Sequence, residues 1–210
     1  MGPPTGRWLK TDLYEERSPH RALLPALASA TWVGADVSAH VARRARAQVG
    51  CTAAVLDVRA LPFADGSFDG VLSTSTLDHF DDVADIDRSL AELRRVLRPG
   101  APLVLTLDNP AHPLVRLRNA LPPAVARRTG LVPFAVGATL GEADGRAALE
   151  AAGFTVGRTA HVLHAPHVIG TRLARFGWYE RRVLPGFAAL GRTRWAHRTG
   201  HFVAFLATAR

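Results

Sequence analysis

The sequence predicts an α/β fold built on a largely parallel sheet, and two observations support that prediction. Short apolar runs alternate along the chain with segments of helical period. Two acidic residues, Asp36 and Asp57, close consecutive apolar runs and lie about twenty residues apart, at the strand ends where open parallel sheets bind ligands. The 210 residues contain no internal repeat or low-complexity linker, so we expect a single domain over residues 1–210.

The apolar runs define the expected strands, which are short and bounded by turn residues. They are Arg7–Thr11, Thr31–Ala35, Ala53–Leu56, Phe68–Ser73, Ala101–Leu107, Phe154–Val162 and His201–Ala209.

Helices are expected between most of these strands. The clearest helix carries Ile86, Leu90, Leu93 and Leu97 at spacings of four, three and four, which is one apolar stripe. Ser38 is placed to cap another helix that runs to about Gln48. The other expected helices are Pro19–Ala28 with Ser18 as its cap, Leu114–Leu121, Arg146–Ala152, and a helical insert over about 164–198.

Composition narrows the class of protein. Cys51 is the only cysteine, and the chain begins without a charged and apolar leader, so we expect a cytoplasmic protein that does not act at a membrane. The net charge of +8 would suit nucleic acid, but Lys10 is the only lysine and the arginines are spread along the chain. This pattern indicates a bias in composition, and a nucleic-acid partner is the less favoured prediction.

The two acidic residues suggest an adenosine-containing ligand. A carboxylate at Asp36 can accept both hydrogen bonds of a ribose diol, and one at Asp57 can accept from the exocyclic amine of adenine. Either residue alone could simply end a strand or begin a helix. The pair, after consecutive strands, favours the ligand.

Three segments that stand in a fixed order resemble the class I S-adenosylmethionine-dependent methyltransferases, type 11-like. They are Val33–Ser38, Asp57–Ser73 with its run LPFADGSFD, and Leu93–Leu105. The resemblance implies a Rossmann-like, doubly wound sheet of seven mostly parallel strands with an antiparallel last strand. It also implies S-adenosylmethionine as the cofactor and a core over residues 7–109.

The resemblance assigns cofactor-binding roles to eight residues, namely Thr11, Asp12, Asp36, Val37, Asp57, Val58, Ser73 and Thr74. The loop after the first strand, which includes Thr11 and Asp12, departs from the family. The family has a glycine-rich loop after the first strand, whereas Leu9–Glu16 contains no glycine. Either Asp12 pairs directly with the ammonium of the cofactor's methionine part, or the cofactor site is degenerate.

The loop after the fourth strand holds the candidate catalytic residues. By resemblance, Asp78 and His79 face the transferred methyl, where a base could deprotonate an acceptor. The alternative is that His79 caps the next helix. The segment lacks the Asn-Pro-Pro-aromatic motif of enzymes that methylate nucleic-acid amines, which favours a small-molecule acceptor.

The spacing of His161, His164 and His167 is a weak metal signal, because only a helix would place them on one face and Pro166 argues against it. We therefore expect no metal site.

The sequence favours methyl transfer to an O, N or C nucleophile of a small molecule. A degenerate methyltransferase-like domain with a binding role, or an RNA methyltransferase supported by the arginines of 172–198, are the alternatives. An NAD-dependent dehydrogenase is disfavoured because the G-x-G-x-x-G fingerprint is absent. We expect a monomer or a homodimer.

Overall fold

A computed structural model describes residues 2–18, 22–120, 137–165 and 177–210. Its centre is a seven-stranded sheet in the order β3-β2-β1-β4-β5-β7-β6. All pairs from β3 to β5 are parallel, and β7 is antiparallel to both of its neighbours, so the predicted sheet is confirmed. The strands are β1 (Gly6–Thr11), β2 (Ala30–Asp36), β3 (Thr52–Val55), β4 (Gly70–Thr74), β5 (Pro102–Asp108), β6 (Phe154–Val162) and β7 (Phe202–Ala209).

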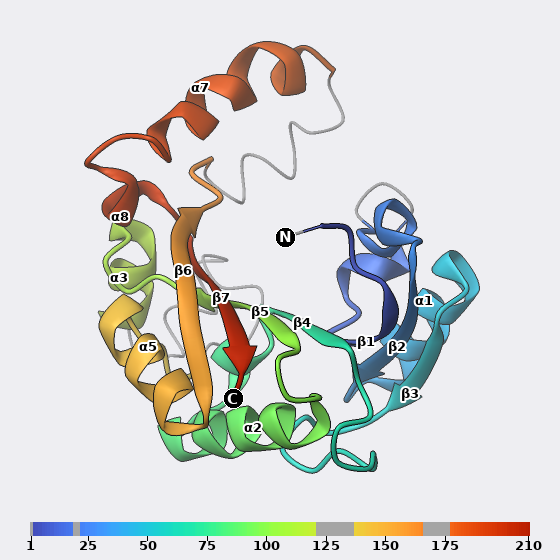
Figure 1. Cartoon of the computed structure of the whole chain (residues 1–210). Coiled ribbons are helices and arrows are strands. Elements are labelled where there is room, and N and C mark those ends of the chain that lie inside the picture. The colour runs from blue at the N-terminus through green and yellow to red at the C-terminus, as the bar shows by residue number, and fades with distance from the viewer. Residues whose placement is uncertain (1, 19–21, 121–136, 166–176) are drawn as a thin grey trace.

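Helices lie around the sheet as Figure 1 shows, with α2 and α5 along one side of it and α1 beside β2 and β3. The helix α7 stands apart from the sheet, beyond the end of β6. Every helix within the described ranges is too short or too polar to cross a membrane. The helices are α1 (Ala39–Val49), α2 (Val83–Val96), α3 (Pro113–Ala120), α5 (Glu142–Ala151), η4 (Tyr179–Val183), α7 (Leu184–Leu190) and α8 (Ala196–Thr199).

The larger hydrophobic core lies between the sheet and α2. The predicted stripe of α2 is buried, with Ile86 and Leu93 fully shielded from solvent and Leu90 at 1% exposure. It packs on β4 and β5, where Leu103 and Leu105 are also fully buried. Burial of this apolar area is the main favourable contribution to folding.

A smaller core fills the other face of the sheet and is built around two tryptophans. The rings of Trp8 and Trp32 lie 5.6 Å apart, and each indole N–H donates to a backbone carbonyl, that of Thr5 or Leu27. Leu24 packs on them. This core fixes the segment between β1 and β2 against the sheet.

That segment differs from the predicted helix Pro19–Ala28, of which residues 19–21 lie outside the described part. Only the 3-10 helices η1 (Glu15–Arg17) and η2 (Leu24–Leu27) form there. The carboxylate of Glu16 accepts the amides of Leu23 and Leu24, and Pro25 has no amide to donate, so an α-helix through these residues is not favoured. Over its described residues the expected helix was wrong. The other expected strands and helices agree with the structure to within a few residues, apart from the insert 164–198, of which residues 166–176 lie outside the described part.

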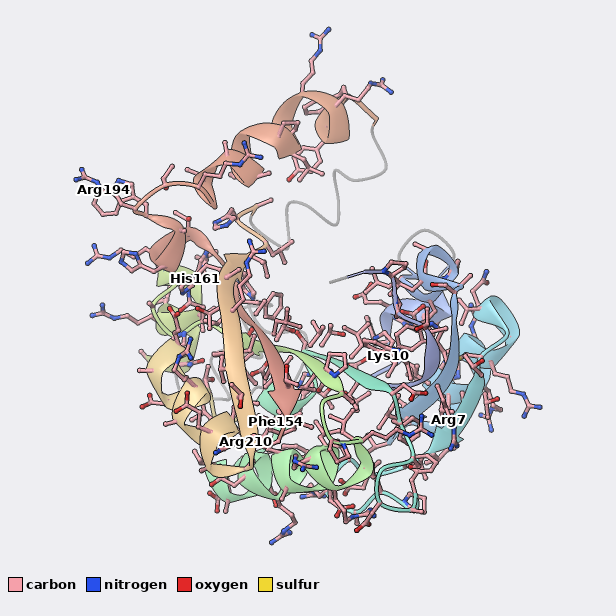
Figure 2. The ribbon with its side chains drawn as sticks, viewed as in Figure 1. Arg7, Lys10, Phe154, His161, Arg194 and Arg210 are labelled. Carbon is pink, nitrogen blue, oxygen red and sulfur yellow. The ribbon has the colours of Figure 1, made fainter. Side chains whose placement is uncertain are left out.

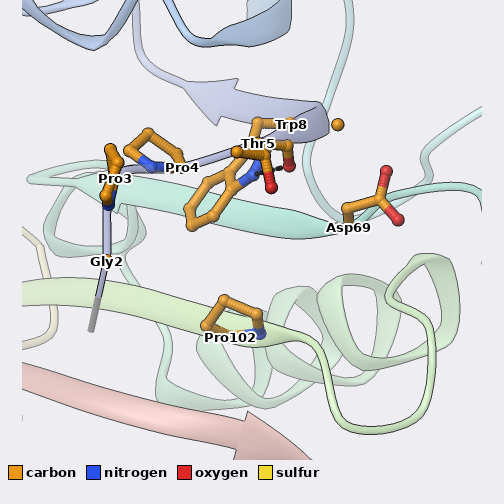
Figure 3. A pocket seen from close by; sticks show the side chains of 8 residues that line it. Gly2, Pro3, Pro4, Thr5, Trp8, Asp69 and Pro102 are labelled. Carbon is orange, nitrogen blue, oxygen red and sulfur yellow. Dashed lines mark hydrogen bonds between the residues drawn. The ribbon is translucent and has the colours of Figure 1, made fainter.

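A shallow hollow of about 360 Å³ lies where strands β1, β4 and β5 begin (Figure 3). It is lined by Gly2, Pro3, Pro4, Thr5, Gly6, Trp8, Asp69 and Pro102. Open parallel sheets bind ligands at the opposite edge, where the strands end, so this hollow is not the candidate site.

Candidate functional site

The candidate site lies at the carboxyl ends of β1, β2 and β4. Strand order reverses between β1 and β4, and such a switch point is where doubly wound sheets bind ligands. The register places Thr11 of β1 beside Ala35 of β2 and Ser73 of β4, so the ends of the three strands are level. The predicted residues Thr11, Asp36 and Ser73 are thereby brought to one edge.

Hydroxyl groups connect the loops after β1 and β4. Thr11 donates to Ser73 at 2.8 Å and shares a second hydrogen bond, 2.7 Å long, with Thr76. Thr11 and Ser73 are fully or almost fully buried. These hydrogen bonds fix the ends of β1 and β4 relative to each other. Thr74, which ends β4, is partly exposed.

Asp36 joins the loop after β1 to the loop after β2. Its Oδ2 accepts the amide of Leu13 at 2.9 Å, and its Oδ1 accepts the amide of Ser38 at 2.8 Å. A carboxylate has about four acceptor sites, so capacity remains for a ribose diol. The neighbouring Val37 is 74% exposed and offers an apolar side chain at the same edge.

Asp57 is engaged by an arginine that the sequence analysis did not single out. The Nε of Arg59 donates to both carboxylate oxygens of Asp57, and its Nη2 donates to Oδ2 at 2.6 Å. These hydrogen bonds hold the pKa of Asp57 below its ordinary value. Arg59 also forms an ion pair with Asp85 of α2, with 2.8 Å between Nη1 and Oδ2. Val58, which lies between Asp57 and Arg59 in the sequence, is buried in the core.

Asp12 is the most unusual acid of the site. Its backbone is left-handed, with φ at 60°, a conformation that glycine adopts freely and that aspartate tolerates better than most residues. Its Oδ1 accepts the amide of Tyr14 at 2.7 Å. Burial raises the pKa of Asp12, although Lys10 and His79 act in the opposite direction. Asp12 thus takes a glycine-like backbone position and places a partly buried carboxylate there.

Beneath this loop lies a buried ion pair that the sequence analysis missed. Lys10 is 1% exposed and Glu16 is fully buried, with Nζ and Oε1 3.8 Å apart. Burial lowers the pKa of Lys10. Figure 2 shows Lys10 inside the fold, whereas Arg194 points outward. A lysine within an apolar strand, and the only lysine of the chain, was the signal that could have found it.

The two candidate catalytic residues have different surroundings. Both belong to the short helix η3 (Leu77–His79), which follows β4. Asp78 is 3% exposed and accepts the amide of Asp108 at 3.0 Å, whereas His79 is exposed. The alternative that His79 caps the next helix was wrong, because Asp82 is the cap of α2.

A second cluster of polar side chains lies at the end of β5. Asn109 is 2% exposed and donates to the carbonyls of His197 and Gly200, which ties the late insert to the sheet. His201 lies 3.7 Å from the carboxylate of Asp108, and its ring contacts His112. Burial lowers the pKa of His112.

Of the three histidines with a spacing of three, the structure describes His161 and His164. His164 bonds Thr199 through Nδ1 and the carbonyl of His161 through Nε2, and His167 lies outside the described residues. The described part of the chain contains no group of three or more potential metal ligands.

Comparison with known proteins gives this site a context. The family model described as "Methyltransferase domain" matches residues 18–105. Residues 18–105 are thus similar to the methyltransferase domain family. The match confirms the resemblance seen in the sequence, and the family and fold imply S-adenosylmethionine as the cofactor.

Individual relatives match over limited lengths. The Bordetella avium biotin biosynthesis bifunctional protein BioCD is 33% identical over 126 residues, which are 54% of this chain and 26% of that protein. The Hahella chejuensis ubiquinone/menaquinone biosynthesis C-methyltransferase UbiE is 45% identical over 60 residues, 28% of this chain and 23% of the relative. The chain therefore spans about a quarter of these curated relatives.

The fold extends the likeness over nearly the whole chain. A solved SAM-dependent methyltransferase of Methanosarcina mazei superposes with a TM-score of 0.66 and 18% identity, covering 97% of this chain and 92% of that one. At this level of identity the comparison confirms the architecture.

The residues at the sheet edge fit S-adenosylmethionine, which carries an ammonium, a ribose and an adenine. Asp12 offers a partly buried carboxylate, for which a cation is the natural partner. Asp36 retains acceptor capacity for the ribose. Asp57 is at the expected position for adenine, although Arg59 already shares its carboxylate.

Proposed function

We propose that this chain transfers a methyl group from S-adenosylmethionine to an O, N or C nucleophile of a small molecule. The proposal rests on a methyltransferase domain whose sheet edge presents the carboxylates of Asp12, Asp36 and Asp57. When bound, S-adenosylmethionine supplies a methyl that its sulfonium already makes electrophilic. The residues of this chain therefore need to bind, orient and exchange a proton.

Each residue has a specific role in the proposal. Asp12 pairs with the ammonium, Asp36 with Val37 holds the ribose, and Asp57 with Val58 holds the adenine. Thr11, Ser73 and Thr74 form the floor beneath the methionine part. The exposed His79 accepts a proton from the acceptor, and the buried Asp78 holds its loop on β5.

The acceptor side of the proposed site is formed by the end of β5 and residues 177–198 of the insert. Asn109 joins the two, because it donates to the carbonyl of His197 in the insert and to that of Gly200 just after it. The absence of an Asn-Pro-Pro-aromatic segment after β4 supports a small molecule. We propose that residues 1–210 act as one domain, as a monomer or a homodimer.

Binding of the cofactor tests the proposal. Calorimetry with S-adenosylmethionine and with S-adenosylhomocysteine should give saturable binding, and both ligands should raise the melting temperature. Absence of binding by either ligand at millimolar concentration would contradict the proposal and favour a degenerate domain. The engagement of Asp57 by Arg59 is the observation that supports that rival.

A second candidate acceptor is RNA, because the insert carries an exposed basic surface. Arg194 and Arg198 both lie over the ring of Trp195, at 5.1 and 5.8 Å from its centroid, and Trp195 is 47% exposed. Arginine with an exposed aromatic ring suits phosphates and stacked bases. Filter binding of structured and single-stranded RNA at two salt concentrations distinguishes this acceptor from a small molecule.

A further inference from the structure

The buried ion pair of Lys10 and Glu16 is unusual for its place in the fold. Its members stand at the two ends of the stretch that is glycine-rich in the resembling family. Lys10 lies in β1, beside Leu72 of β4, and Glu16 lies in η1. Both side chains are shielded from solvent, with exposed fractions of 1% and 0%.

Lys10 holds the residue of the loop with the least favourable backbone. Its Nζ donates to the carbonyl oxygen of Asp12 at 2.7 Å and to the hydroxyl of Thr74 at 3.3 Å. Asp12 has the left-handed φ of 60°, a conformation that costs a side-chain-bearing residue more than glycine. The lysine therefore stabilises a turn that glycine would adopt without help.

Glu16 holds the other end of the loop. Its two carboxylate oxygens accept the amides of Leu23 and Leu24, each at 3.2 Å. Leu24 begins η2 and packs on the core of Trp8 and Trp32. Through Glu16, the loop is connected to a rigid part of the fold.

Stability alone does not account for this ion pair. Removing two charges from water is unfavourable, and a well-packed apolar pair of similar size often stabilises a fold as well or better. An apolar pair could not donate to the Asp12 carbonyl or accept the amides of Leu23 and Leu24. Through these hydrogen bonds, the charged pair fixes the position of the loop backbone.

We propose that Lys10 and Glu16 are positioning residues that replace the missing glycines by holding the Asp12 turn ready for the cofactor. Lys10 is too deeply buried to touch a ligand, so it acts through Asp12, whose carboxylate the turn directs to the ammonium of S-adenosylmethionine. This inference rests on the proposed function, because it assumes that the loop binds the cofactor.

A double variant separates positioning from stability. Lys10→Met alone leaves a buried, unpaired Glu16 and should lower both the melting temperature and the affinity for S-adenosylmethionine. The double variant Lys10→Met/Glu16→Leu should recover most of the melting temperature, while calorimetry still shows an affinity about tenfold or more below wild type. Arg146→Met, which removes a charge on α5, serves as the control and should bind normally.

Hydrogen exchange of the wild-type protein tests the same inference without a substitution. The amides of Tyr14, Leu23 and Leu24 bond side chains of the loop, so they should exchange slowly even before the cofactor is added. Fast exchange of these amides would overturn the inference. If wild type binds S-adenosylmethionine, a double variant that binds it equally tightly would also overturn the inference. A wild type that does not bind, with slow exchange, contradicts the proposed function alone.

Discussion

Asp12 and Asp57 are both carboxylates at the binding edge of the sheet, yet their surroundings are opposite. Asp57 is 38% exposed on its side chain and paired with Arg59, which lowers its pKa. Asp12 is partly buried, and its desolvation raises its pKa. The carboxylate of Asp57 has a charged partner within the protein, namely Arg59. The carboxylate of Asp12 is ionised only at the cost of its desolvation. Groups held at such a cost cluster at functional sites.

The comparison also separates the part of the chain that follows the family from the part that departs from it. Asp57 stands in the segment LPFADGSFD, which resembles the family closely, whereas Asp12 stands in a loop without glycine. The backbone of Asp12 is left-handed, a conformation that glycine adopts most readily. In this chain the turn carries a side chain, with a lysine beneath it and a glutamate at its end.

The largest effect is expected for Asp12→Asn. Asparagine keeps the size, the tolerance of a left-handed backbone and an acceptor for the amide of Tyr14, but it removes the charge. Truncating one partner of a buried, hydrogen-bonded charge pair costs about 2–5 kcal/mol, so affinity for S-adenosylmethionine should fall about a hundredfold or more by calorimetry.

The same variant should be more stable than wild type without ligand. Because burial raises the pKa of Asp12, ionisation of this residue works against folding above that pKa, and asparagine removes the unfavourable term. Asp12→Gly, which tolerates the left-handed backbone and removes the side chain, is the matched control for the backbone. A wild-type protein that binds and an Asp12→Asn variant that binds equally well would contradict the role of Asp12.

Asp36→Ala should have the next largest effect. A hydrogen bond to a charged group contributes about 1.5–3 kcal/mol, so loss of the ribose contact should weaken binding of S-adenosylmethionine about ten- to a hundredfold. The change also frees the amides of Leu13 and Ser38, so Asp36→Asn, which keeps an acceptor for one of them, is the control. An affinity unchanged by calorimetry would rule out ribose binding at Asp36.

The two carboxylates should also respond differently to pH. Binding of S-adenosylmethionine should weaken as the pH falls through the raised pKa of Asp12, because the neutral acid cannot pair with an ammonium. Asp57 stays ionised to lower pH, since Arg59 depresses its pKa. Calorimetry should show that the affinity of wild type for S-adenosylmethionine depends on pH in the acid range and that Asp12→Asn abolishes this dependence. If the variant keeps the same dependence, another group is responsible for it.

Sequence reasoning predicted what depends on local pattern, and missed what depends on contacts distant in the chain. The apolar stripe of α2 and the strand ends at Asp36 and Asp108 follow from spacing and turn residues. The contact of Lys10 with Thr74 joins positions 64 residues apart, and no periodicity reports it. The failed helix at Pro19–Ala28 has the same origin, because Glu16 takes up the amides of Leu23 and Leu24.

The smallest effect is expected for Arg59→Met, which removes the partner of Asp57. Arg59 and Asp57 are 35% and 38% exposed, and exposed ion pairs contribute little, so the melting temperature at neutral pH should fall by at most about 3 °C. The pKa of Asp57 should return toward its ordinary value. In wild type, the lowered pKa of Asp57 adds stability above the pKa of its unfolded form, and this stability is lost as the pH falls through the lowered folded value. The variant lacks this contribution, so the difference in melting temperature between the two proteins should shrink as the pH falls.

Binding by this variant decides how Asp57 takes part in the site. A carboxylate with acceptor capacity left over can hold an adenine amine and Arg59 together, so the affinity of Arg59→Met for S-adenosylmethionine should stay within about threefold of wild type. Leu61, whose amide is held by Glu92, keeps the following loop in place in the variant. An affinity tenfold higher than that of wild type would show that Arg59 competes with adenine for Asp57. The adenine-binding part of the site would then be the part that differs from the family.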